Sequence, residues 1–159
     1  MKVIAIDPGY DRVGLAILEK SSAGEILHYS QCLETDRKKA LNDRILEIGS
    51  LIEETIIKYQ PDTLAIETLF FNKNIKTAIA VAEARGVIIY LAKKYQCQVY
   101  EFGPQEIKVA VTGYGKSDKG AVINMVKRLI KNVPDQALDD EYDAIAVGIT
   151  CIAHNGFHR

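Results

Sequence analysis

Three short apolar runs rich in branched residues open the sequence, and residues typical of turns separate them. They cover residues 3–6, 13–18 and 26–33. A Pro-Gly pair follows the first run, and residues 21–24 separate the second from the third. Runs of this length between turn residues predict β-strands, and connections this short favour antiparallel pairing. The N-terminal part is therefore expected to form a meander of three antiparallel strands.

The pattern changes to helical spacing at Leu41. From there the apolar residues recur every three or four positions, as on one face of a helix, until Pro61 ends the pattern. Residues 63–67 and 97–102 then read as two strands, and residues 74–95 between them read as a long helix. A strand, a helix and a strand in this order predict a right-handed parallel crossover.

The remaining third of the chain has the spacing of three helices. A short helix follows Pro104 to about Val111, and the loop GYGKSDKG leads to a helix over residues 119–130 with Ser117 as its expected N-cap. The last helix covers residues 138–153. The sequence contains no repeat and no linker. We therefore expect residues 1–159 to form one α/β domain, with a mixed sheet of three antiparallel strands followed by parallel ones.

Composition narrows the class of protein. The chain is 48% hydrophobic and 26% charged, with a net charge of -1, as in a globular protein that buries its own core. No apolar run approaches the length of a membrane helix and no secretory leader is recognisable, so we expect a cytoplasmic protein. Three cysteines without metal-site spacing are expected to be reduced thiols: Cys32, Cys97 and Cys151.

The charge is unevenly distributed along the chain. Residues 72–131 hold 11 Lys and Arg against 4 Asp and Glu, so this segment carries +7 and the rest of the chain -8. Such a segment is typical either of an ordinary solvated surface or of a face that binds phosphate. Charge alone leaves both interpretations open.

Two acidic residues stand at the ends of predicted strands. Asp7 and Glu67 are each the first charged residue after an apolar strand core. Asp before Pro-Gly is also an ordinary turn residue. In open α/β sheets, however, ligands bind at the carboxyl ends of strands where the winding changes direction. If the two strands are neighbours, both carboxylates lie in that crevice.

The last helix adds two more carboxylates. Asp140 and Asp143 are three positions apart and so share a helix face. The helix dipole alone accounts for acids in a first turn, but Asp143 lies a turn inside, among apolar residues. Four carboxylates in one crevice repel each other unless a cation lies among them, and Mg²⁺ or Mn²⁺ prefers such oxygen ligands. A pair of these ions promotes phosphodiester hydrolysis by water.

Four motifs in the order and spacing seen here resemble the RuvC family of bacterial Holliday-junction resolvases. They are IAIDPGYDRVGLAI, IETLFFNKN, EARG and DEYDAIAVGITCIAH, and the resemblance covers essentially the whole chain. It implies an RNase H-like fold, a homodimer, and divalent-metal hydrolysis that nicks a four-way DNA junction at two symmetric positions. The implied products are 5′-phosphate and 3′-hydroxyl ends, formed during recombination and repair. It also implies a RuvA–RuvB branch-migration motor as partner.

The resemblance assigns roles residue by residue. It implies that the catalytic carboxylates hold the metal, two Mg²⁺ per site with Mn²⁺ able to substitute: Asp7, Glu67, Asp140 and Asp143. Some members have His at the position of Asp140. Phe70 matches an aromatic that probes the junction, although Phe70 and Phe71 are equally typical of a core. The basic residues implied or suggested to meet DNA are Lys73, Lys76, Lys108, Lys116 and Lys119.

Two other functions remain compatible with the residues. In the first, the chain would be an RNase H-like nuclease for another nucleic acid. In the second, it would be a binding module that keeps the fold without catalysis. The complete set of four carboxylates favours an enzyme over a binding module. Only substrates of different shapes separate the two nuclease hypotheses.

Overall fold

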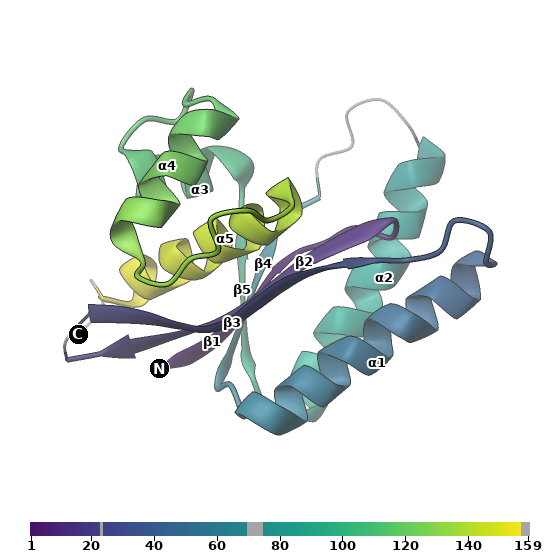
Figure 1. Cartoon of the computed structure of the whole chain (residues 1–159). Coiled ribbons are helices and arrows are strands. Elements are labelled where there is room, and N and C mark those ends of the chain that lie inside the picture. Colours follow the sequence, from purple (N-terminus) through teal and green to yellow (C-terminus); the bar gives the residue numbers. More distant parts are fainter. Residues whose placement is uncertain (23, 70–74, 157–159) are drawn as a thin grey trace.

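A computed structural model describes residues 1–22, 24–69 and 75–156. Its centre is a five-stranded mixed sheet in the order β3-β2-β1-β4-β5 (Figure 1). The strands β1, β2 and β3 form an antiparallel meander, and β4 and β5 continue the sheet in parallel with β1. The bounds are β1 (Lys2–Asp7), β2 (Arg12–Ser21), β3 (Gly24–Glu34), β4 (Thr63–Glu67) and β5 (Gln98–Phe102). The expected architecture is confirmed.

Helices cover both faces of this sheet. One face packs on α1 (Leu41–Tyr59) and α2 (Ile75–Lys94), and the other packs on α5 (Asp139–Gly156) (Figure 1). The helices α3 (Pro104–Thr112) and α4 (Lys119–Leu129) pack around α5. Successive side chains of a strand point to opposite faces. In β1, Ile4 and Ile6 therefore join the core under α1 and α2, while Val3 and Ala5 join the core under α5.

Two glycines let α5 lie against the sheet. A Cβ on Gly14 of β2 would stand 1.8 Å from the Asp140 carbonyl oxygen, and a Cβ on Gly148 of α5 would stand 2.4 Å from Leu18 Cδ1. No side chain has room at either position. The first turn of α5 therefore rests on the backbone of β2, beside the end of β1.

One local prediction is wrong. The N-cap of α4 is Asp118, whose carboxylate accepts a hydrogen bond from the Ala121 amide at 2.8 Å. The hydroxyl of Ser117 instead pairs with Thr112 Oγ1 at 2.7 Å and bonds the Tyr114 carbonyl at 2.7 Å. Asp and Ser are both good N-caps, and the short turn after α3 engages Ser117, so the cap is the next residue, while the helix begins at Lys119 as expected.

Other features agree with the expectations from the sequence. The thiols of Cys32, Cys97 and Cys151 are free, and the latter two are buried. Within the described ranges, none of the helices has the length and apolarity that crossing a membrane requires. Strands β2 and β3 are longer than their apolar cores because the ladder between them continues through polar pairs as far as Arg12 opposite Glu34.

Candidate active site

The two acids at strand ends are neighbours. Strand β1 lies parallel beside β4 with Ile6 opposite Ile66, so Asp7 and Glu67 follow at the same edge of the sheet. Arg85 of α2 reaches this edge, where its Nε donates to the Glu67 carbonyl oxygen at 3.4 Å while its guanidinium pairs with Glu101. The backbone that carries Glu67 is thus held between β1 and α2.

The first turns of α5 bring two more carboxylates to this edge. Burial, and after it the charges of Glu67, Asp143 and Asp140, together raise the pKa of Asp7 to about 8, and Lys119 opposes this shift. Burial and Asp143 likewise raise the pKa of Glu67. Because each of these charges acts at short range inside a protein, the four carboxylates form one electrostatic cluster.

Two cationic side chains neutralise part of this cluster. Lys119 of α4 places its Nζ 3.1 Å from Asp143 Oδ2 and 3.3 Å from Asp139 Oδ2. Burial lowers the pKa of Lys119, but its bonds to the two carboxylates outweigh this and raise it. Burial raises the pKa of Asp143, and Lys119 opposes this shift. On the other side, Arg12 Nη1 of β2 lies 3.4 Å from Asp140 Oδ2.

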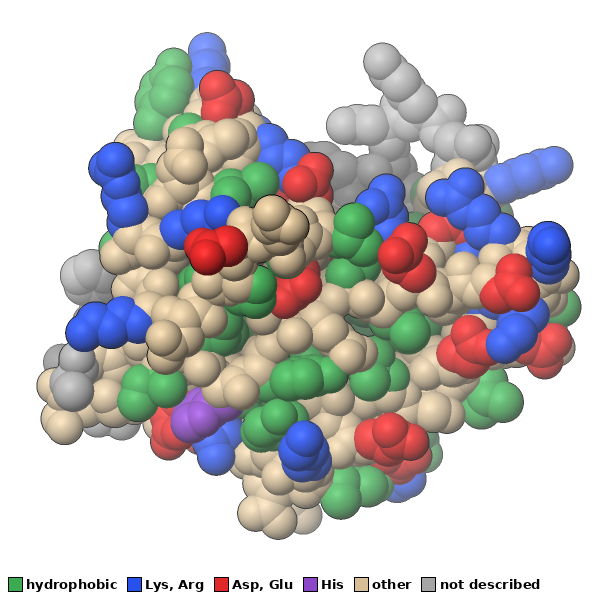
Figure 2. Space-filling model, in the orientation of Figure 1, with side chains coloured by type: hydrophobic (Ala, Val, Ile, Leu, Met, Phe, Trp, Pro, Cys, Tyr) green, Lys and Arg blue, Asp and Glu red, His purple; other side chains and the backbone are tan. Residues whose placement is uncertain are grey.

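A cavity of about 230 Å³ opens beside these groups. Glu67, Asp143, Lys108 and Lys119 line it, with an apolar wall of Pro104, Ile107, Val122 and Ala146 from α3, α4 and α5. Figure 2 shows this side of the molecule, where acidic side chains near the upper middle have Lys or Arg side chains on either side. Carboxylates and ammonium groups in one cleft are suited to a phosphate that meets a metal.

The donor chemistry fits a hard divalent cation. Burial first, and then the charges of neighbouring acids, raise the pKa values of Asp7, Glu67 and Asp143, so their charged forms are unfavourable unless a cation lies among them. In the parts of the chain that the structure describes, however, no three His, Cys, Asp or Glu side chains are arranged so that they hold one ion. In the structure, Asp140 instead forms an ion pair with Arg12, and Asp143 forms one with Lys119.

Comparison with known proteins identifies the family. The profile of the family "Crossover junction endodeoxyribonuclease RuvC" matches residues 3–151. The chain belongs to the RuvC family. It is 39% identical to the crossover junction endodeoxyribonuclease RuvC of Petrotoga mobilis, over 100% of this chain and 96% of that protein. It is 43% identical to the enzyme of the same name from Thermosipho melanesiensis, over 96% and 97% of the two chains.

Two solved structures have the same fold as this chain. Thermus thermophilus RuvC in complex with a Holliday junction substrate superposes with a TM-score of 0.92 at 25% identity, covering 99% of this chain and 96% of that one. The yeast mitochondrial resolvase Ydc2 gives 0.67 at 15% identity, over 98% and 80%, which shows the fold alone. The RNase H-like fold and the resemblance inferred from the four motifs are thereby confirmed.

Not every predicted contact residue lies in the described part. Phe70, Phe71 and Lys73 fall outside the described residues. Lys76 is exposed in the first turn of α2, which follows them, and Lys116 is exposed in the loop between α3 and α4. Lys108 and Lys119 line the cavity together with Glu67 and Asp143.

The residues that hold the turn after Asp7 in place were not identified from the sequence. Buried Arg44 of α1 donates to Thr35 Oγ1 at 2.9 Å and to the Tyr10 carbonyl at 3.0 Å, and it pairs with the Asp11 carboxylate. These bonds anchor the turn that follows Asp7. A lone Arg inside a helix pattern gives little warning of this, because most arginines lie on the surface.

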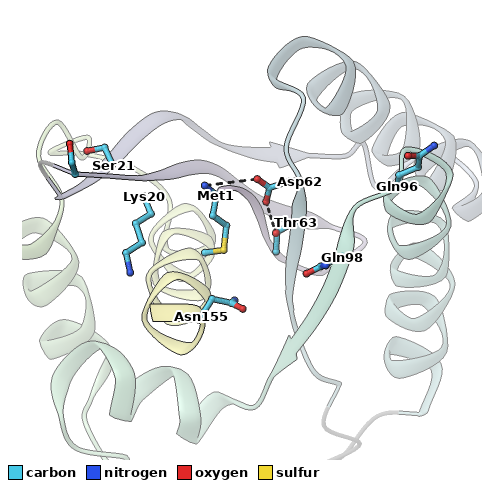
Figure 3. A pocket seen from close by; sticks show the side chains of 9 residues that line it. Met1, Lys20, Ser21, Asp62, Thr63, Gln96, Gln98 and Asn155 are labelled. Carbon is cyan, nitrogen blue, oxygen red and sulfur yellow. Dashed lines mark hydrogen bonds and ion pairs between the residues drawn. The ribbon is translucent and has the colours of Figure 1, made fainter. Parts of the chain in front are cut away.

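A larger cavity lies at the opposite end of the sheet. It has a volume of about 870 Å³ and is lined by residues at the amino ends of the parallel strands, including Met1, Thr63 and Gln98 (Figure 3). Asp62 in this cavity accepts hydrogen bonds from the Thr63 hydroxyl at 2.6 Å and the Lys2 amide at 3.0 Å. Its carboxylate is thus used within the chain, and the cavity is remote from the four acids.

Proposed function

We propose that this chain is a Holliday-junction resolvase that nicks four-way DNA at two symmetric phosphodiesters by metal-assisted hydrolysis. The carrying observation is the convergence of four carboxylates from β1, β4 and α5 with Lys108 and Lys119 around one cleft. Membership of a family of crossover junction endodeoxyribonucleases supports the same reaction. We further propose that residues 1–159 act as one nuclease domain in the cytoplasm, in recombination and repair.

The proposed metal ligands are Asp7, Glu67, Asp140 and Asp143. Divalent ions bound there, two Mg²⁺ or Mn²⁺, would supply a Lewis acid for water attack and for the leaving oxygen, giving 5′-phosphate and 3′-hydroxyl ends. The protein contributes position: Asp7 and Glu67 are fixed by adjacent parallel strands, and Asp143 by a helix that rests on Gly14. Asp140 and Asp143 each have a competing cation, Arg12 for the first and Lys119 for the second.

Lysines around the cleft are proposed to hold the DNA backbone. Lys108 and Lys119 lie beside the acids, so they would contact the cut strand, while exposed Lys76 and Lys116 would contact phosphates farther out. Lys73 belongs to the same proposal. Phe70 is proposed to stack on a base at the junction centre, a contact of about 1–3 kcal/mol. Phosphate contacts of this kind are independent of sequence and weaken with salt.

The exposed face of α2 supports a homodimer. Ile79 and Tyr90 are 52% and 65% exposed, and the small residues Ala82 and Gly86 lie exposed between them at helical spacing. The opposite face of α2, with Ala84 and Ile88, packs on the sheet. A second copy of this helix across a two-fold axis would cover the exposed face and present two sites to two equivalent strands. A RuvA–RuvB motor is proposed as a further partner.

Gly86→Arg is predicted to convert the dimer into a monomer. A Cβ at Gly86 meets nothing within 4 Å, so the fold of one subunit tolerates the change, but a large charged side chain prevents close approach of two helices. Light scattering after size exclusion measures the mass. Ser50→Arg, at an exposed position of α1, is the matched control and should remain dimeric. A Gly86→Arg protein with the mass of a dimer would contradict the proposed interface.

The function is tested with an end-labelled four-way junction in Mg²⁺ beside a linear duplex, a flap and an RNA–DNA hybrid of related sequence. We expect paired symmetric nicks in the junction alone, because the two sites of a dimer match its two equivalent strands. Equal cutting of duplex or hybrid would favour an RNase H-like nuclease for another substrate. Junction binding without any cleavage in Mg²⁺ or Mn²⁺ would favour a binding module.

A further inference from the structure

Both proposed metal ligands on α5, Asp140 and Asp143, pair with cations that come from other elements. Asp143 pairs with Lys119 of α4, which the proposed function already places at the DNA backbone. Asp140 pairs with Arg12, which follows Asp7 by five residues and begins β2. Arg12 has no place in the proposed function so far. The symmetry of the two ion pairs suggests that it does for Asp140 what Lys119 does for Asp143.

We propose that Arg12 is a phosphate-binding residue that holds Asp140 until metal and DNA arrive, and then binds a phosphate of the cut strand. This inference rests on the proposed function and extends it to a residue on the opposite side of the acids from Lys108 and Lys119. The cut strand would then be held from both sides: by lysines of α3 and α4 on one, and by an arginine of β2 on the other.

The geometry allows Arg12 to exchange partners. Its side chain is 42% exposed and that of Asp140 is 26% exposed, so the pair is partly open to solvent, where an ion pair contributes little stability. The backbone below it is fixed, because the Thr35 amide donates to the Asp11 carbonyl at 3.0 Å and Arg44 binds the Tyr10 carbonyl. The guanidinium is therefore the part that can move.

Arg12 pairs with Asp140, while the acid next to Arg12 in the chain pairs with other arginines. The carboxylate of Asp11, next in the chain, is engaged by Arg44 and by Arg37, whose Nη2 lies 3.4 Å from Asp11 Oδ2. A divalent ion with its double charge competes for a carboxylate better than one guanidinium does. Arg12, once displaced, would remain beside the acid cluster, where its planar fork matches the oxygens of a phosphate.

The first test measures metal binding without DNA. We expect Arg12→Gln to bind Mn²⁺ about three- to tenfold more tightly than the unchanged protein in calorimetric titration, because a competing cation has been removed. Arg37→Gln is the matched control: it also removes an arginine 3.4 Å from a carboxylate, but one outside the acid cluster. Equal Mn²⁺ affinity of the two variants, or weaker binding by Arg12→Gln, would overturn the proposal.

The second test measures the phosphate contact. Junction binding is followed by fluorescence anisotropy in Ca²⁺ at increasing salt, with a gel to verify that the DNA stays intact. Arg12→Gln should lower the slope of log affinity against log salt by about one, whereas Arg12→Lys should keep most of it. Lys20→Gln, an exposed residue near the far end of β2, should leave the slope unchanged. An unchanged slope for Arg12→Gln would overturn the phosphate role.

The two tests separate this inference from the proposed function. If the unchanged protein fails to nick junctions, the Mn²⁺ affinities of the variants still decide whether Arg12 competes for Asp140. If it nicks junctions while Arg12→Gln behaves as Arg37→Gln in the titration, only the role of Arg12 is lost. Thermal unfolding of each variant shows whether it is folded, and Arg12→Lys provides a second variant that retains the charge.

Discussion

Asp7→Asn is expected to reduce junction cleavage by about a thousandfold or more while leaving junction binding intact and making the metal-free protein more stable at pH 8. Asn keeps the shape of the side chain but removes the charge that holds a metal, and the loss of metal-assisted catalysis amounts to several kcal/mol of barrier. The lysines proposed to bind phosphate are unchanged, so affinity for the junction persists. Cleavage and binding are measured on the same labelled junction.

The stability gain follows from the raised pKa of Asp7. In the folded protein this pKa is about 8, against an ordinary value of 3.8 for an Asp side chain. Between those values the folded state binds a proton that the unfolded state has lost, so stability falls as pH rises through this window. Asn has no such proton, and the variant should gain about 2–5 kcal/mol over the unchanged protein at pH 8 and almost nothing near pH 4.

Denaturant unfolding in a chelator at both pH values checks this result. Opposite signs for activity and stability distinguish a catalytic carboxylate from one that supports the fold. Glu101→Gln is a suitable control, since this exposed carboxylate pairs with Arg85 outside the cluster and should give no gain at pH 8. An Asp7→Asn variant that cleaves at the normal rate would show that the proposed site is wrong. A variant less stable at pH 8 would contradict the electrostatic account of the cluster.

Gly14→Ala is expected to destabilise the fold by about 3 kcal/mol or more and to impair cleavage even where the protein still folds. The added Cβ would stand 1.8 Å from the Asp140 carbonyl oxygen and 3.2 Å from the Ala144 Cβ. Because the nearest atom belongs to the helix backbone, α5 itself must move away from β2, and overpacking of this kind costs stability. The same shift carries Asp140 and Asp143 away from Asp7.

Denaturant unfolding and junction cleavage of Gly14→Ala provide the measurement. Gly120→Ala in α4 is the matched control, because its Cβ would meet only the Asp118 carboxylate oxygen at 3.4 Å, an ordinary contact. That variant should be as stable as the unchanged protein or slightly more so, since Ala favours helix over Gly. Equal stabilities for the two glycine variants would mean that α5 does not depend on close contact with β2.

The acids could be predicted from sequence because each one breaks a strong local pattern. Asp7 and Glu67 end apolar strand cores, and Asp143 interrupts the apolar face of the last helix. The antiparallel meander and the parallel crossover followed from the change between short turns and a helical connection, whereas the structure decided that β4 lies beside β1. Ser117 was the wrong cap because two adjacent residues suit the position and a contact with Thr112 decides between them.

The order of elements, the mixed sheet and four candidate carboxylates could be predicted from the sequence, since hydrophobic spacing and charge are local properties. The surroundings of the acids come from the tertiary structure. The pairing of Arg12 with Asp140, the anchoring of the turn by Arg44 and the contact of α5 with Gly14 join residues at least 33 positions apart. Such pairings depend on how the layers pack, and no short-range pattern records them.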